Sequence, residues 1–174
     1  MYLACISQVI TSSPVKSNPS TRMMQESLAS LDRHGGLGRC RKLIMCDGFK
    51  VRSRSQPKQG VITDEEAGRY TAYVRRVAEL CRKDAAFRRT RVVRLARRQG
   101  SAYAIREAVT GHVHTPLVII VPHDCVIARP LRLDALATAM AAQPHRLKYV
   151  KLLGASTATY AQAALGFDRF TFHI

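Results

Sequence analysis

The sequence has few of the residues on which several common classes of protein depend. It contains no tryptophan, and aromatic residues make up only 6% of the chain, which leaves few flat side chains for stacking on nucleic-acid bases. No apolar run approaches the roughly 18 residues that a membrane-spanning helix requires. The longest, Pro116 to Pro122, has five aliphatic residues at its centre, so no transmembrane segment is predicted.

The amino terminus lacks the features of a secretory signal. Residues 1–10 are apolar, but they have no basic start, and Ser7 and Gln8 interrupt them. A signal sequence combines a cationic lead with a small-residue cleavage site. We interpret the segment as a buried strand. The default expectation for location is then the cytoplasm, although no pattern names a compartment.

The cysteines lack the spacing of a metal site or a disulfide framework. Their number is odd, and no two show the C-x-x-C spacing of a zinc ligand pair. Several lie within apolar runs, where cysteine behaves as a small hydrophobic residue. A reduced, interior role is expected for Cys5, Cys40, Cys46, Cys81 and Cys125.

Acidic residues are also scarce. Twelve Asp and Glu accompany 28 Lys and Arg, which gives a formal net charge of +16. Between Arg75 and Arg98, ten cations minus two acids give +8, half of that total. Such a segment attracts nucleic acid, anionic lipid or a nucleotide diphosphate. Charge alone does not distinguish a binding surface from a solvated, arginine-rich helix face.

The chain does contain a regular alternation of strand-like and helix-like segments. Short apolar runs predict strands, and apolar residues at i, i+4 and i+7 predict helices between them. Thr63 and Glu66 form a capping box that predicts a helix start, and His34-Gly35-Gly36 predicts a helix end. The predicted strands are Leu3–Ile10, Lys42–Cys46, Arg91–Leu95, Leu117–Val121 and Leu147–Leu152, and the helices begin near Thr21, Thr63, Ser101 and Leu133.

This alternation predicts the fold class. Strands separated by helices pair in parallel, and the helices cover both faces of the sheet. We therefore predict one α/β domain over residues 1–152, a three-layer sandwich around a mostly parallel sheet. The run Leu117 to Val121 is apolar at every position, which predicts a central strand buried on both faces. Residues 153–174 are predicted to be an irregular tail or the start of an acceptor region.

Polar residues follow the first four predicted strands. In open parallel sheets, ligands bind outside the carboxyl ends of the strands, so these positions hold the candidate site. They offer carboxylates, hydroxyls, arginine, and glycines that allow close backbone approach, a set that suits a nucleotide diphosphate. The candidates are Thr11, Ser12, Ser13, Asp47, Gly48, Arg98, Gly100, His123 and Asp124.

Three widespread motifs are missing from the sequence. The G-x-G-x-x-G fingerprint does not follow the first strand, and no P-loop is present. These absences argue against an ordinary NAD dehydrogenase and a P-loop NTPase. The absence of a G-x-S-x-G elbow argues against a serine hydrolase of the α/β-hydrolase type.

Four other motifs occur in a fixed order. The first strand ends in Thr-Ser-Ser, the second in Cys46-Asp47-Gly48, and the fourth in Pro122-His123-Asp124. Before the fourth strand, the segment Arg98-Gln99-Gly100-Ser101-Ala102-Tyr103-Ala104-Ile105-Arg106 matches Asn-x-Gly-x-Ala-x-Ala-x-Asn at its Gly and Ala positions. Over residues 3–152 this order resembles glycosyltransferases of the family 2 type. The resemblance implies a Rossmann-like nucleotide-diphospho-sugar transferase fold, incomplete at its C-terminus here.

The same resemblance implies an activity, the transfer of a sugar from a nucleotide diphosphate to an acceptor hydroxyl. Asp47 would accept a hydrogen bond from the base, beside Thr11. Asp124, with His123, would hold Mn²⁺ or Mg²⁺ against the diphosphate, and imidazole suits Mn²⁺ better. Arg98 would pair with the phosphates. The catalytic base, the donor and the acceptor are not identified.

Two departures from the family leave alternatives open. One aspartate, Asp124, stands where two are usual, and hard cations prefer several oxygen ligands. The 22 residues of 153–174 are too few for an acceptor region. The chain could instead be a truncated, non-catalytic nucleotide-binding domain, or a basic nucleic-acid-binding protein that uses Arg75 to Arg98. Asp47 could also be a turn residue that binds its own following backbone.

Overall fold

The described part of the chain, residues 6–56 and 59–152 of a computed structural model, contains a parallel four-stranded sheet. The chain divides into two compact units, Met1–Leu131 and Arg132–Ile174. The sheet lies in the first unit, with the strand order β5-β2-β1-β6 and every pair parallel. Its strands are β1 (Ile6–Ser12), β2 (Arg41–Cys46), β5 (Thr90–Arg94) and β6 (Leu117–Pro122).

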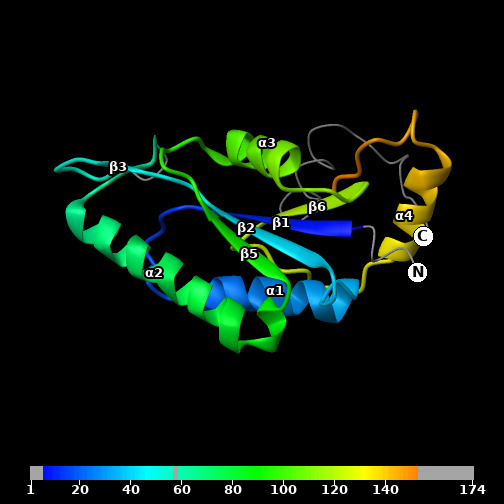
Figure 1. Ribbon diagram of the computed structural model, residues 1–174, viewed down its shortest axis with the longest axis horizontal. Helices are drawn as coiled ribbons and strands as arrows, with labels where there is room; N and C mark the ends of the chain where they lie inside the picture. Colours follow the sequence, from blue (N-terminus) through cyan, green and yellow to red (C-terminus); the bar gives the residue numbers. More distant parts are fainter. Residues whose placement is uncertain (1–5, 57–58, 153–174) are drawn as a thin grey trace, which may run out of the picture. The chain divides into compact units, whose positions relative to one another are not determined.

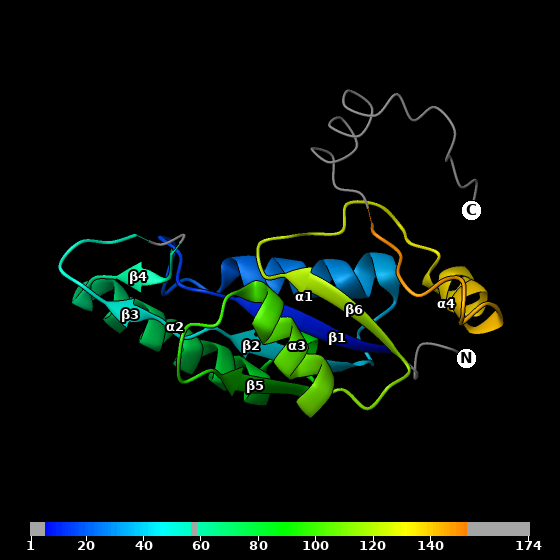
Figure 2. The ribbon, with the colours of Figure 1, turned by 90° about the horizontal axis from the view of Figure 1, so that it is seen from above.

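Helices cover both faces of this sheet (Figures 1 and 2). Helices α1 (Arg22–Gly35) and α2 (Asp64–Lys83) lie on one face, and α3 (Ser101–Gly111) lies on the other. The predicted α/β fold class, with a mostly parallel sheet between helices, is therefore confirmed. The segment between β2 and α2 contains a short parallel pair, β3 (Lys50–Val51) and β4 (Val61–Ile62), and the 3-10 helix η3 (Ala85–Phe87) joins α2 to β5.

The helix ends follow the predicted signals. Gly36, directly after α1, has φ of 64°, the left-handed conformation that glycine adopts without strain. The Thr63 side chain accepts a hydrogen bond from the Glu66 N–H at 3.3 Å, and the Glu66 carboxylate accepts one from the Thr63 N–H at 2.9 Å. The capping box that opens α2 is therefore confirmed. No helix in the described ranges is both long enough and apolar enough to cross a membrane.

Removing this cap should destabilise the protein. Thr63→Ala is expected to lower the free energy of unfolding by about 1 kcal/mol, because one of the first N–H groups of α2 loses its acceptor. Urea denaturation of Thr71→Ala provides the control, since Thr71 is exposed within the same helix and alanine has the higher helix propensity there. Equal losses in both variants would show that the cap does not stabilise α2.

The core lies around the two central strands. Val9 and Ile10 of β1 and Ile44 and Met45 of β2 are fully buried. On the α3 side, Val9 and Met45 pack against small residues of the helix, which let it approach the sheet closely. A buried polar residue is also accommodated in β1, because Gln8 Nε2 donates to the Leu37 carbonyl at 2.6 Å.

The prediction that residues 117–121 form a central strand is wrong. β6 is an edge strand of the described sheet, and Ile120 is 39% exposed. The place of a strand in a sheet depends on its hydrogen-bonded partners, which its own apolar pattern does not record. β1 has the more polar pattern but is one of the two central strands, and the Gln8 amide nitrogen finds an acceptor there while its Oε1 has no partner among the described residues.

The predicted fifth strand, Leu147–Leu152, is also wrong. These residues have no regular secondary structure, and Tyr149 is 75% exposed. A strand persists only when its backbone groups pair with a neighbour, and within residues 6–56 and 59–152 no strand pairs with this segment. The preceding helix α4 (Leu133–Ala142) has its predicted bounds and belongs to the second unit.

The first strand extends further than predicted. β1 runs to Ser12, so Thr11 and Ser12 lie in the strand and Ser13 begins the loop after it. Of the predicted strand, residues 3–5 lie outside the described residues. The extension brings the polar end of β1 level with the end of β2, since Ser12 pairs with Cys46 in the register.

Candidate functional site

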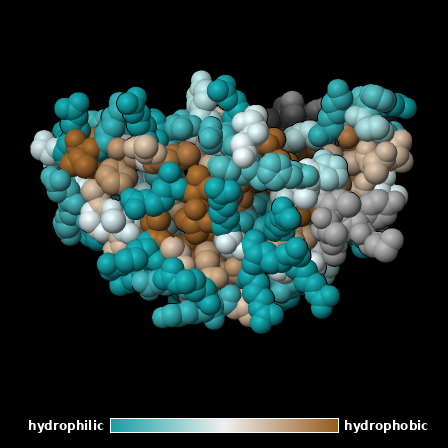
Figure 3. All heavy atoms as spheres, viewed as in Figure 1, coloured by the Kyte–Doolittle hydropathy of each residue, from teal (hydrophilic) through white to brown (hydrophobic). Residues whose placement is uncertain are grey.

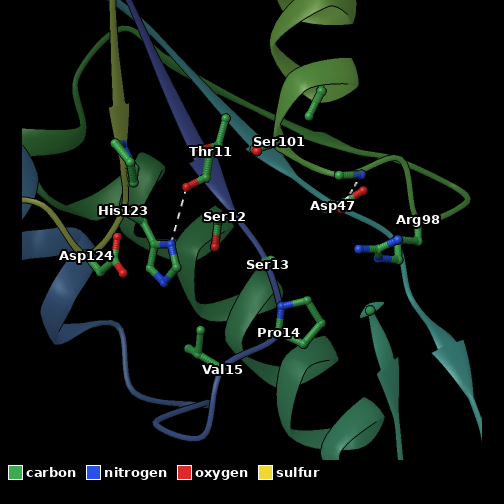
Figure 4. A pocket seen from close by; sticks show the side chains of 14 residues that line it. Thr11, Ser12, Ser13, Pro14, Val15, Asp47, Arg98, Ser101, His123 and Asp124 are labelled. Carbon is green, nitrogen blue, oxygen red and sulfur yellow. Dashed lines mark hydrogen bonds between the residues drawn. The ribbon is translucent and has the colours of Figure 1, made fainter. Parts of the chain in front are cut away.

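The carboxyl ends of β1, β2 and β6 open onto a cavity of about 410 Å³ (Figure 4). Every candidate residue except Gly48 lines it. Sequence reasoning missed Gly60, which belongs to a loop that folds back from β3. It also missed Ser101, whose position directly after Gly100 could have indicated it. The lining residues are Thr11, Ser12, Ser13, Pro14, Val15, Asp47, Gly60, Arg98, Gly100, Ser101, Ala104, Pro122, His123 and Asp124.

Asp47 and Asp124 lie at the same rim of the sheet. They follow β2 and β6, and β1 lies between these two strands in the sheet. All three strands are parallel, so their carboxyl ends still face one cavity. In Figure 4, His123 and Asp124 lie opposite Asp47 and Arg98, with the end of β1 between them. The cavity therefore has two polar walls.

The first wall depends on the Asp47 carboxylate. Asp47 is 8% exposed, and its side chain accepts hydrogen bonds from the backbone N–H groups of Gly48, Gln99 and Gly100 at 2.9, 2.8 and 2.9 Å. The bond to Gly48 is the local turn contact that the sequence left open, and the other two tie β2 to the loop before α3. A carboxylate has about four acceptor positions, so about one remains for a ligand.

Gly48 contributes through close packing and does not line the cavity. A Cβ at this position would meet the backbone carbonyl group of Arg97. The loop of residues 97–100 can therefore approach the end of β2 only because residue 48 is glycine. Gly100, which caps α3, has φ of 81°, a conformation that L-residues with a side chain rarely adopt.

The second wall contains a buried, neutral histidine. His123 is 5% exposed, and its ring packs against Tyr73 at a centroid distance of 6.4 Å. Burial lowers the pKa of His123 against the opposing effects of Asp124 and the Thr11 carbonyl, so the ring is neutral at pH 7. Nδ1 lies 3.3 Å from the Thr11 carbonyl oxygen and donates to it. Nε2 then holds the lone pair and has no partner among the described residues.

The exposed Asp124 and His123 are the side chains of this wall that could hold a divalent cation, and the His123 ring would have to turn to do so, because its Nε2 is buried. Metal-binding histidines commonly donate one ring N–H to a carbonyl and present the other nitrogen to the metal. No cluster of three or more His, Cys, Asp or Glu occurs within the described ranges, so the protein would supply two ligands. Mg²⁺ and similar ions take their remaining ligands from water and substrate phosphates, and the imidazole favours Mn²⁺.

Two tyrosines of α2 support the strand ends. Tyr70 donates to the Asp47 carbonyl at 3.1 Å, and the Ser12 hydroxyl donates to the Tyr73 oxygen at 3.1 Å. Their rings stack at 5.8 Å. Burial raises the pKa of both phenols, so both stay protonated. Helical spacing showed that these residues face the core, but it did not reveal these contacts.

Comparison of the sequence with protein-family models and with curated proteins found no match. Function is therefore inferred from the fold and from the geometry of the cavity. The fold itself is α/β with a parallel sheet flanked by helices, compatible with a Rossmann-like architecture.

Proposed function

We propose that the cavity binds a nucleoside-diphosphate sugar together with a divalent cation, and that the chain is the donor-binding part of a glycosyltransferase. One observation carries this proposal. A single cavity is lined by a carboxylate beside a neutral imidazole, opposite a wall of backbone amides and arginine. Its volume of about 410 Å³ lies in the usual range for small-molecule sites.

Each part of the donor has a suitable counterpart in the cavity. The remaining acceptor position of Asp47 suits an N–H of the base, and the hydroxyl groups at the end of β1 suit the ribose. Arg98 and the first N–H groups of α3 face the phosphates, since no side chain caps that helix. His123 and Asp124 would hold Mn²⁺ or Mg²⁺, and a cation bound there neutralises charge on the leaving diphosphate.

A second candidate function is nucleotide binding without sugar transfer. In the described part of the chain, Asp47 and Asp124 are the carboxylates that line the cavity. Asp47 is occupied by three backbone N–H groups, and Asp124 is assigned to the cation. Neither then serves as the base that deprotonates an acceptor hydroxyl.

Calorimetric titration with UDP-glucose and with GDP-mannose, with and without Mn²⁺, tests the proposal. We expect one of them to bind at least about tenfold more tightly with Mn²⁺. The positive charge of the cation is then paired with the negative charge of the diphosphate in a partly enclosed site. Binding that ignores Mn²⁺, or no binding of either compound, would contradict the proposal.

Cysteine labelling provides a second readout of the same binding. Cys125 is exposed, and its sulfur lies 3.9 Å from the Asp124 carboxylate. Its thiol pKa is raised by desolvation and by Asp124, so iodoacetamide is applied at mildly alkaline pH and the labelled peptides are identified by mass spectrometry. Donor plus Mn²⁺ should slow labelling of Cys125 and leave the half-buried Cys81 of α2 unchanged. Equal protection of both thiols would indicate general stabilisation instead of site occupancy.

A further inference from the structure

Five arginines follow one open edge of the sheet, and we call them the basic ridge. All five are exposed. The three ion pairs found in the described part of the chain join Arg22 to Glu26, Arg69 to Glu65 and Arg132 to Asp134, so none involves the ridge. The ridge therefore presents five uncompensated positive charges. Its members are Arg88, Arg89, Arg91, Arg94 and Arg97.

The ridge arginines point to both faces of the sheet. β5 is an edge strand, and successive side chains of a strand alternate between faces. Arg91 lies on the same face of the strand as Val93, which packs against the core under α3. Arg94 lies on the opposite face, where it lines a second cavity with Tyr70 and Val74 of α2. The charges therefore lie on both sides of the β5 edge.

Apolar side chains accompany these charges on both faces of the strand, and we call them the apolar strip. Val92, Val93 and Leu95 are half-buried on or beside β5. Figure 3, in the view of Figure 1 with β5 in front, shows hydrophobic side chains between groups of hydrophilic ones at the centre of this face. The surface thus combines phosphate-binding groups with an apolar floor, which a purely solvated charge surface would not require.

An exposed aromatic residue follows the ridge. Tyr103, in the first turn of α3, is 59% exposed, and the Arg106 guanidinium lies 5.6 Å from its ring centroid. α3 begins at Ser101, four residues after Arg97. Exposed aromatic rings beside arginine are the platforms on which unpaired bases stack. A single ring of this kind in the described part of α3 suits a surface in which charge contributes most of the affinity.

We infer that the basic ridge binds single-stranded nucleic acid. Arg91 and Arg94 leave the strand on opposite sides, an arrangement that a flat bilayer matches less well than a flexible ligand does. A flexible chain of phosphates can pass around the edge and meet both, and arginine is the side chain best shaped for phosphate. The bases then contact the apolar strip and Tyr103. No ridge arginine lines the cavity at the strand ends, although Arg97 adjoins Arg98, which does, and the inference does not depend on the function proposed for that cavity.

Edge protection is the competing explanation of the same residues. Charged side chains on an edge strand prevent the strand from pairing with other sheets, and they need no ligand to do so. The two explanations differ in solution, because edge protection predicts no saturable binding to nucleic acid. They also differ in the expected effect of substitutions, because only nucleic-acid binding requires the ridge arginines in particular for affinity.

Fluorescence anisotropy of a labelled oligothymidylate, titrated at several salt concentrations, tests the inference. Each phosphate contact with a single strand contributes about 0.7 to the slope of log K against log salt. The triple variant Arg91→Gln, Arg94→Gln, Arg97→Gln should therefore lose about 2 units of slope and about 100-fold in affinity near 0.1 M salt. Tyr103→Ala should lose about tenfold and Tyr103→Phe little, because the ring face is retained.

A charge-matched control separates the ridge from net charge. Lys16→Gln, Arg33→Gln, Arg129→Gln removes three exposed cations outside β5 and should retain the affinity within about threefold, a change that long-range charge alone would produce. Equal losses in the two triple variants would overturn the inference. So would the absence of oligothymidylate binding, or preferential binding to vesicles of phosphatidylserine and phosphatidylcholine. Circular dichroism confirms that each variant is folded.

Discussion

Gly48→Ala is expected to lower the free energy of unfolding by about 2–3 kcal/mol, the cost typical of forcing an extra methyl group into a packed site. The added Cβ would meet the carbonyl group of Arg97, which is backbone and cannot rotate away as a side chain can. The loop of residues 97–100 must move, and the N–H groups of Gln99 and Gly100 then leave the Asp47 carboxylate. Urea denaturation measures the loss of stability.

Gly68→Ala is the matched control for this substitution. Gly68 lies within α2, and no atom outside its own helical turns comes within 4 Å of the Cβ that alanine would add. The change should raise stability by about 0.5–1 kcal/mol, because alanine favours the helix. If Gly48→Ala were as stable as Gly68→Ala, the close approach of the two loops would not matter for folding. If Gly48→Ala alone weakened nucleotide binding, the loop would also be shown to form the site.

The rim of the site could be predicted because it follows from a topological rule. Alternating strands and helices predict parallel pairing, and parallel strands place their carboxyl ends at one edge. Thr11, Asp47 and Asp124 were identified in this way, and all three line one cavity. The rule requires only the type and order of the elements, which local periodicity supplies. It does not require the order of the strands in the sheet, and that order was wrong for β6.

The interactions inside the site could not be predicted because they join residues far apart in the sequence. The bonds from Asp47 to Gln99 and Gly100 span 52 and 53 positions, and the bond from Ser12 to Tyr73 spans 61. No periodic pattern records such distances. The sequence left open whether Asp47 is a turn residue or a ligand-binding residue. In the structure, its side chain makes the turn contact with Gly48 and also links the end of β2 to the loop before α3.

The two walls of the cavity differ in what fixes them. The Asp47 wall is held by backbone hydrogen bonds and by tyrosines of α2, so its shape is set by folding. On the other wall, Asp124 is exposed, and the Cys125 thiol lies 3.9 Å from its carboxylate. Substitutions in the first wall should therefore affect stability and binding together. A substitution at Asp124 should affect binding and turnover alone, which makes it the cleaner test of function.

Asp124→Asn is expected to reduce Mn²⁺-dependent hydrolysis of the bound sugar nucleotide by about 100- to 1000-fold, the usual cost of losing one group that stabilises transition-state charge. Asparagine has the same shape but no charge, so the exposed site should keep its stability. Asp134→Asn is the control, because that exposed carboxylate lies on α4 and pairs with Arg132 at 3.3 Å. Hydrolysis is followed by release of the free sugar with and without Mn²⁺. Equal rates for wild type and Asp124→Asn would exclude the metal role of this residue, whereas binding without any hydrolysis in the wild type would favour a nucleotide-binding domain that lacks its catalytic base.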